Sequence, residues 1–109
     1  MLTPRMTPST LAVLRTFLED PEAPRYGLQI CQQSGHKSGT VYPVLDRLEE
    51  AGWLVAEWEE VRPQDSGRPR RRLYRLTPLG LARATNAATE AAKQIIPLAW
   101  APTWNPGRA

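Results

Sequence analysis

Cysteine and histidine are almost absent from this chain. Among its 109 residues there is one cysteine, Cys31, and one histidine, His36. A single cysteine cannot form an internal disulfide, which agrees with a reducing compartment, and one thiol with one imidazole cannot build a zinc site. The sequence also offers no phosphate-binding loop and no nucleophile beside a base. We therefore predict a protein without metal, cofactor or enzymatic activity.

Long apolar runs are missing as well. The longest stretch without a charged residue, 94–107, contains three prolines and is too short to span a bilayer. No apolar segment follows the first arginine, Arg5, so the N-terminus does not resemble a signal peptide. The length fits one small domain. We expect a cytoplasmic protein with no membrane partner.

Arginine, in contrast, is concentrated in one part of the chain. Residues 62–83 contain seven arginines and a single acid, Asp65. This segment has a local excess of six positive charges, whereas the net charge of the whole chain is +3. A basic strip of this kind favours a polyanionic partner.

Hydrophobic spacing and capping residues predict three helices in the first half of the chain. The first begins at Pro8 or Ser9, with Ser9 or Thr10 as its cap. The second covers about residues 26–33 and is closed by Ser34 and Gly35, since glycine readily takes the left-handed conformation of a helix end. The third has Ser38 as its N-cap and covers about residues 38–51, until Gly52 stops it.

A hairpin and a last helix follow. Strand-forming residues alternate over 53–61 and 70–76, with a turn-rich segment between them. Thr77 then caps a helix over 78–96, which Pro97 is expected to end. The fold class is therefore mainly α with a small two-stranded β-hairpin. Three helices followed by a hairpin is the plan of a winged helix-turn-helix, in which the hairpin (about 61–72 at its tip) is the wing.

The third helix is a candidate reader of DNA. If its apolar stripe faces the core, several polar or small residues near its N-terminus face outward. Hydroxyls and a lysine can bond phosphates, and the helix N-terminus itself favours an anion. These residues are Lys37, Ser38, Thr40, Tyr42, Pro43 and Arg47. Helix composition alone leaves open a simpler interpretation, a helix cap with a solvated face.

The wing is the second candidate. Its arginines cannot all be structural, because a two-stranded ribbon has no interior for several guanidinium groups. We expect some of them to lie along a phosphate row or in a minor groove, chiefly Arg68, Arg70 and Arg71. The alternative is a charged edge that prevents strand-to-strand aggregation. Trp58 is expected to pack on a wing arginine, and Trp53 to close the core.

Three segments, "YGLQI", "SGTVYPVLDRLEEAGWL" and "GRPRRRLYRLTPLG", resemble the PadR family of bacterial transcriptional regulators over about residues 11–84. The resemblance implies a dimeric repressor on a palindromic operator, with Ser38, Thr40 and Tyr42 as recognition-helix contacts and Arg68 and Arg70 as wing contacts. It also implies that the last helix and the first serve in the dimer interface. Some members of the family sense small aromatic molecules there.

The chain accordingly divides into an arm (1–8), a winged-helix domain (9–77), a dimerisation helix (78–96) and a Trp/Pro-rich tail (97–109). The residues expected to line the dimer interface, or to form a flat ligand wall, are Leu79, Ile95, Trp100 and Trp104. One other function stays open: a winged-helix interaction module whose arginines bind an acidic surface of a partner protein.

Overall fold

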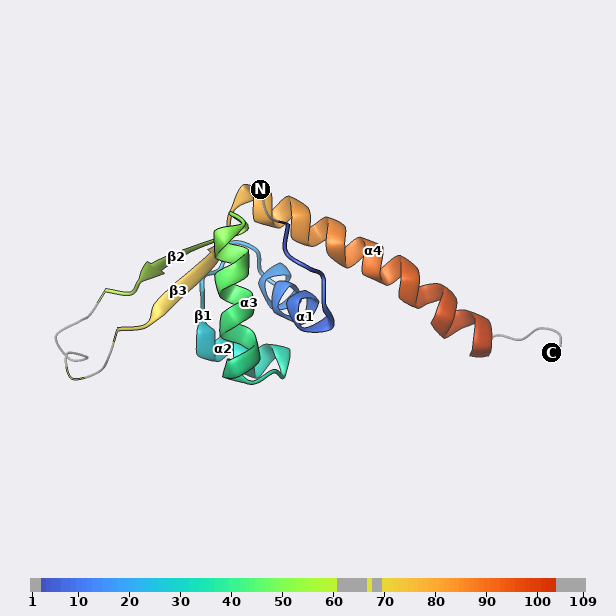
Figure 1. The fold of residues 1–109 in the computed structure, drawn as a ribbon, viewed down its shortest axis with the longest axis horizontal. Helices are drawn as coiled ribbons and strands as arrows, with labels where there is room; N and C mark the ends of the chain where they lie inside the picture. The colour runs from blue at the N-terminus through green and yellow to red at the C-terminus, as the bar shows by residue number, and fades with distance from the viewer. Residues whose placement is uncertain (1–2, 61–66, 68–69, 104–109) are drawn as a thin grey trace.

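Three short helices, a small sheet and one long helix make up the computed structural model, which describes residues 3–60, 67 and 70–103, with side chains up to residue 93 (Figure 1). The elements in chain order are α1 (Pro8–Leu18), β1 (Arg25–Tyr26), α2 (Gly27–Ser34), α3 (Ser38–Glu50), β2 (Leu54–Trp58), β3 (Arg72–Leu76) and α4 (Pro78–Thr103). The predicted class, mainly α with a winged helix-turn-helix, is confirmed.

The sheet has three strands where the sequence predicted two. β3 lies in the middle, paired antiparallel with β2 on one side and with β1 on the other. β1 consists only of Arg25 and Tyr26, opposite Tyr74 and Leu73. Two residues show no periodicity, so this strand exists because of its tertiary pairing, which the sequence pattern could not reveal.

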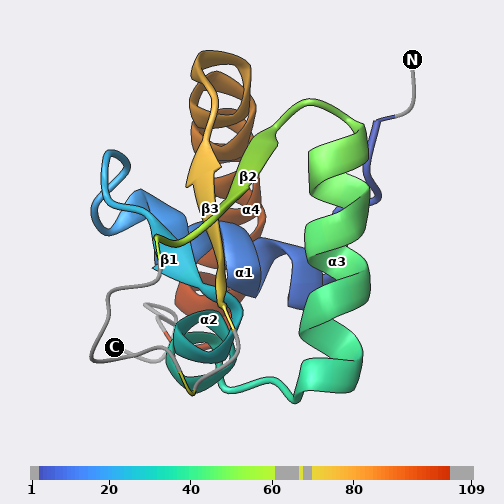
Figure 2. The ribbon, with the colours of Figure 1, turned by 90° about the vertical axis from the view of Figure 1, so that its left-hand side faces the viewer.

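The core lies where α1, α2 and α3 meet the sheet (Figure 2). Its largest fully buried side chains are Val13, Leu14, Phe17, Ile30, Val41, Val44, Leu45 and Leu48. Burying each such side chain stabilises the fold by about 1.5–3 kcal/mol. Trp53 is only 6% exposed and closes this core, as predicted.

Two predicted helix caps are one to three residues off. The cap of α1 is Thr7, whose Oγ1 accepts a hydrogen bond from the Thr10 backbone N–H at 3.2 Å. The N-cap of α3 is Lys37 and not Ser38, because the Lys37 carbonyl already accepts from the Val41 N–H at 2.9 Å. The two predicted glycine stops, Gly35 (φ 76°) and Gly52 (φ 81°), both lie in the left-handed region, the conformation that was predicted for Gly35.

The joint between the hairpin and α4 is tightly fixed. Thr77 caps α4 as predicted: its Oγ1 accepts from the Gly80 N–H at 2.9 Å and donates to the Gly52 carbonyl at 2.6 Å. Gly80 is buried against the backbone of Trp53, where a Cβ would come within 2.7 Å of the Trp53 carbonyl carbon. These contacts set the direction in which α4 leaves the body.

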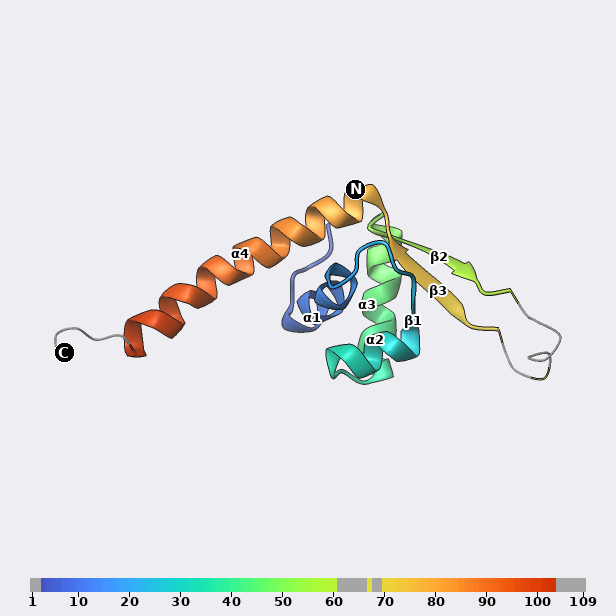
Figure 3. The same ribbon diagram turned by 180° about the vertical axis from the view of Figure 1, so that it is seen from behind.

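The prediction that Pro97 ends the last helix is wrong, because α4 continues to Thr103. A proline removes one N–H and crowds a carbonyl in the preceding turn, but its fixed φ is close to the helical value, so a helix can pass through it. Figure 3 shows α4 extending well beyond the three-helix body. In the described part of the chain, no helix combines the length and apolar character needed to cross a membrane.

Candidate nucleic-acid interface

The outer face of α3 is exposed as the sequence predicted. Its inner stripe, Val41, Val44, Leu45 and Leu48, is buried. The residues predicted to face a ligand are all exposed: Lys37, Ser38, Thr40, Tyr42, Pro43 and Arg47. In Figure 2, α3 stands at one side of the molecule; the N-terminal segment passes beside its C-terminal end, while among the described residues its first turns have no neighbouring segment on their outer side. The first turns of this helix are therefore sterically free to enter a groove.

Tyr42 has a second role that the sequence did not reveal. Its ring lies directly against Gly27, the first residue of α2, where a Cβ would come within 2.6 Å of the ring carbons Cε1 and Cζ. The ring is nevertheless 42% exposed. The absence of a side chain at Gly27 thus lets α2 and α3 approach closely and supports an aromatic ring at the outer surface.

Glu59 organises the base of the wing. Its carboxylate accepts hydrogen bonds from the Tyr26 hydroxyl (3.1 Å), the Arg71 backbone N–H (3.0 Å) and Arg71 Nε (3.4 Å). The Arg71 guanidinium also lies over the Tyr26 ring, 4.1 Å from its centre. The backbone carbonyl of Glu59 accepts from Arg70 Nε at 3.2 Å. No pattern in the sequence singled out Glu59.

Two further arginines of β3 have acidic partners. Arg72 forms an ion pair with Glu49 of α3 at 2.9 Å and lies over the Trp58 ring at 5.6 Å, the cation–π contact that was predicted. Arg75 pairs with Glu57 of β2 at 3.3 Å. Glutamates on α3 and β2 therefore supply partners that an isolated ribbon would lack. A sign of this was present in the sequence, since Glu57 lies near the end of β2 and Glu59 and Glu60 follow directly after it.

The described wing arginines consequently differ in whether a nearby carboxylate neutralises their charge. Arg71, Arg72 and Arg75 each have a glutamate partner. Arg70 is exposed and has no acidic partner among the residues that the structure describes. Arg68, the other predicted contact near the tip, lies outside the described residues.

The recognition helix and the wing border a common hollow of about 200 Å³. Tyr42 of α3, Leu28 of α2 and Arg70 of the wing are among the residues that line it. Nearby, burial raises the pKa of the Tyr74 hydroxyl above its ordinary value of 10.0, while the Arg72 charge opposes this rise. Tyr74 therefore stays neutral at physiological pH and adds no negative charge to this side of the protein.

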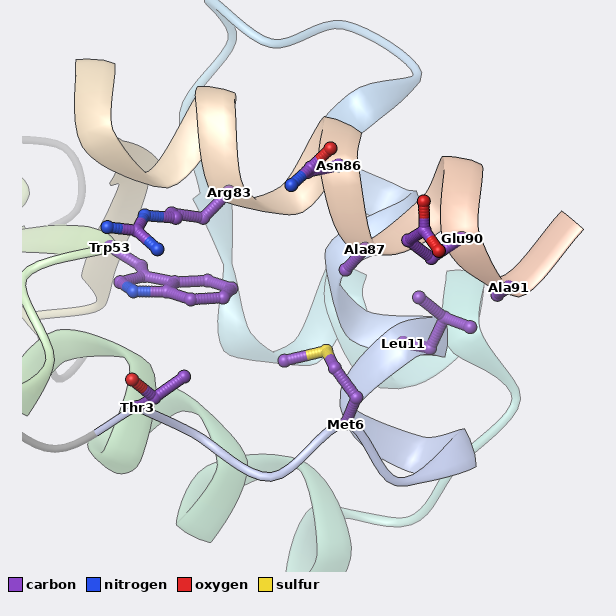
Figure 4. A pocket seen from close by; sticks show the side chains of 9 residues that line it. All are labelled: Thr3, Met6, Leu11, Trp53, Arg83, Asn86, Ala87, Glu90 and Ala91. Carbon is purple, nitrogen blue, oxygen red and sulfur yellow. The ribbon is translucent and has the colours of Figure 1, made fainter. Parts of the chain in front are cut away.

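A second hollow, of about 400 Å³, lies between the N-terminal segment and the first half of α4. Figure 4 shows the Arg83 guanidinium beside the Trp53 ring, with Met6 and Leu11 below and Ala87 above. Leu79, a predicted interface residue, is 38% exposed at the start of α4. The side chains of Ile95 and Trp100 fall outside the described part of the structure, as does all of Trp104.

The single cysteine and the acidic residues form no metal-binding cluster in the described part of the chain. Cys31 is a half-buried free thiol packed against the core. Among the described residues there is no group of three histidine, cysteine, aspartate or glutamate side chains that could hold a metal ion.

Comparisons with known proteins agree with this geometry. A sequence model described as the transcriptional regulator PadR-like family matches residues 16–86. No curated protein matches the sequence. The crystal structure of smu.1704 from Streptococcus mutans UA159 is similar with a TM-score of 0.72 and 21% identity, covering 94% of this chain and 95% of that one.

Two other solved structures are similar in fold. A PadR family transcription regulator from Clostridium difficile R20291 has a TM-score of 0.65 and 23% identity, covering 83% of this chain and 95% of that one. The PcaV transcriptional regulator from Streptomyces coelicolor, in complex with its natural ligand, has a TM-score of 0.70 and 27% identity. That match covers 94% of this chain but 66% of PcaV.

Proposed function

Because the chain belongs to the PadR-like family of transcriptional regulators, we propose that it binds double-stranded DNA sequence-specifically and acts in the cytoplasm as a dimeric repressor. The observation that carries this proposal is the shared hollow, which brings Tyr42 of the recognition helix and Arg70 of the wing to one side of the molecule. A helix and a wing on the same side can contact a groove and the adjacent backbone together.

The recognition helix enters the major groove with its N-terminal half. Lys37 and Ser38 bond phosphates near the helix N-terminus, while Thr40, Tyr42 and Pro43 meet base edges and sugars. Arg47 lies one turn further along the helix, facing the backbone. Glu49 is occupied by Arg72, and Glu50 is exposed and acidic, so the C-terminal end of the helix stays out of the groove.

The wing contributes charge. Arg68 and Arg70 contact the backbone or the minor groove, and Arg71 contributes less because Glu59 neutralises part of its charge. Each phosphate that is neutralised releases counterions, so binding falls steeply as the salt concentration rises.

Dimerisation uses α4 together with α1. The helix extends away from the body in Figure 1, and Leu79 and Leu81 near its start are 38% and 39% exposed. An extended helix of this length has no partner over its second half within the described chain. A second copy, related by a two-fold axis, would cover it and would place two recognition helices on a palindromic operator. Ile95, Trp100 and Trp104 are the proposed contacts of its distal part.

The hollow beside Trp53 is where we place a small aromatic effector. Trp53, Met6 and Leu11 offer apolar surface, and Arg83 offers a cation at one side. An occupant there would touch both the winged-helix body and α4, so it could alter the spacing of the two recognition helices. Filling the hollow with Ala87→Leu should abolish release by small aromatic compounds without preventing DNA binding. Release that persists in this variant would contradict the placement.

A gel-shift assay with the DNA upstream of the chain's own gene, competed with unrelated DNA, tests the proposed function. We expect the protein to stay bound to the upstream DNA at competitor concentrations that displace it from unrelated duplex DNA. Equal affinity for both would contradict specific repression. Failure to bind any duplex at moderate salt, with co-purification of an acidic protein, would favour the interaction module instead.

A further inference from the structure

We propose that Glu59 is a positioning residue of the wing: it aims Arg70 and Arg71 toward the DNA without contacting the DNA itself. This inference rests on the proposed DNA-binding function. It goes beyond it by assigning a role to an acidic residue, in a place where electrostatics alone would make an acid unfavourable for binding.

The first observation is the way in which the hairpin ladder ends. The regular pairing of β2 with β3 reaches Trp58 opposite Arg72. One residue further, the Glu59 N–H still donates to the Arg71 carbonyl at 2.9 Å. The Arg71 N–H, however, donates to the Glu59 side chain, Oε1, at 3.0 Å. The carboxylate has thus taken the place of the residue's own backbone carbonyl.

The second observation is what the freed carbonyl does. Glu59 O accepts from Arg70 Nε at 3.2 Å, while the carboxylate accepts from Arg71 Nε at 3.4 Å. Both guanidinium groups are held through Nε. Their terminal nitrogens make no hydrogen bond within the described part of the protein, and they carry the N–H groups that can grip a phosphate. One residue therefore orients two adjacent cations.

The third observation is a link to the helix-turn-helix. Glu59 Oε2 accepts from the hydroxyl of Tyr26, the residue directly before α2, at 3.1 Å. The Glu59 side chain is only 10% exposed, so water cannot easily replace these bonds. The base of the wing is in this way fixed relative to α2, and Arg70 and Arg71 line the same hollow as Tyr42 of the recognition helix.

A simpler alternative predicts the opposite change in operator affinity when Glu59 is removed. If Glu59 acted only as a charge near DNA, its removal would take away a repulsion from phosphates and strengthen binding. If it positions Arg70 and Arg71, its removal should weaken binding although the protein becomes more positive. Glu57 is the matched control: it is also a glutamate of the wing, it pairs with Arg75, and its side chain is 58% exposed.

The test measures operator affinity and its salt dependence for Glu59→Ala and Glu57→Ala. We expect Glu59→Ala to weaken operator binding about tenfold and to lower the slope of log K against log salt by about one, because about one phosphate contact is lost. Glu57→Ala should bind as tightly as the unmodified protein or more tightly. A Glu59→Ala protein that binds as tightly as the unmodified protein, or more tightly, would overturn the proposal.

Two milder variants keep the test decisive should Glu59→Ala fail to fold. Tyr26→Phe removes one hydroxyl and no charge, and we expect about threefold weaker operator binding. Glu59→Gln keeps an acceptor for the Arg71 N–H, and we expect it to bind the operator almost as tightly as the unmodified protein. Unchanged affinity in Tyr26→Phe, together with tighter operator binding in Glu59→Gln than in the unmodified protein, would point to simple charge repulsion and against positioning.

A readout without DNA separates this inference from the proposed function. Hydrogen exchange of the Arg71 amide should be slow in the unmodified protein and in Glu59→Gln, and fast in Glu59→Ala. Equal protection in all three would overturn the positioning role. If the unmodified protein binds no duplex at all, the proposed function fails, yet the exchange measurement still decides whether Glu59 orders the base of the wing.

Discussion

The ring of Tyr42, on the recognition helix α3, lies against the backbone of Gly27, where α2 begins. A Cβ at position 27 would come within 2.6 Å of two ring carbons, closer than non-bonded atoms approach. The ring is the end of a partly exposed side chain, so it can swing away from such an atom. The contact thus couples the spacing of the helix-turn-helix to the direction of an aromatic side chain on the surface that we propose to face DNA.

Gly27→Ala should therefore affect recognition more than stability. We expect a change of less than about 1 kcal/mol in the free energy of unfolding, because only a mobile ring is displaced. Operator affinity should fall by about as much as in Tyr42→Ala, and the double variant should be no worse than either single one. Urea unfolding and gel shifts check this. Additive losses in the double variant would show that the two residues act independently.

Gly80→Ala should behave in the opposite way. The added Cβ would meet the backbone of Trp53, which cannot swing aside. We expect a loss of about 2–3 kcal/mol in the free energy of unfolding, since overpacking of a buried site forces backbone shifts. Gly39→Ala is the control, because a Cβ there has no neighbour within 4 Å. It should be neutral or stabilising by about 0.5–1 kcal/mol in a helix. Comparable losses at both positions would contradict the close approach at Gly80.

Arg70→Ala and Arg75→Ala should show how an arginine without an acidic partner and a paired arginine differ in their contribution to DNA binding. Arg70 has no acidic partner among the described residues, whereas Arg75 is paired with Glu57. We expect Arg70→Ala to weaken binding to operator and unrelated DNA alike and to reduce the salt slope by about one. Arg75→Ala should change the slope little. Binding at several salt concentrations checks this, and equal slopes for the two variants would contradict the division.

Alkaline pH should destabilise the fold through Tyr74. Burial raises the pKa of its hydroxyl in the folded protein above the ordinary value of 10.0. The folded state therefore holds this proton more tightly than the unfolded chain does. Its contribution to stability is complete below pH 10 and is lost as the pH rises through the folded pKa. Tyr74→Phe should flatten the stability curve above pH 10, as measured by urea unfolding. Identical curves would show that Tyr74 is not the cause.

The sequence predicted the fold well where the hydrophobic periodicity was clear and where glycines marked the ends of helices. The stripe from Val41 to Leu48 was buried as predicted, and Gly35 and Gly52 ended their helices. The strand Arg25–Tyr26 was not predicted, because two residues carry no pattern and the pairing partner lies far along the chain. The end of α4 was misplaced because a proline disfavours a helix without forbidding it.

The exposure of the candidate residues on α3 was predicted from the sequence, whereas the partners of the wing arginines were not. Spacing along α3 sufficed to separate outer from inner residues, so the exposed set was correct. Which arginines are paired depends on Glu49, Glu57 and Glu59, which tertiary structure brings beside them. The same holds for Tyr42 and Gly27, which are distant in sequence. Contacts between elements are not encoded in local periodicity, and therefore needed the structure.

Selection of bound sequences from random duplex DNA tests the central claim most directly. A dimeric winged-helix repressor should enrich one palindromic sequence, with two half-sites about 34 Å apart, roughly one turn of DNA. The enriched duplex should be bound at least about a thousandfold more tightly than unrelated DNA at physiological salt. Enrichment of no sequence, or of a single half-site without a symmetric partner, would contradict sequence-specific binding by a symmetric dimer.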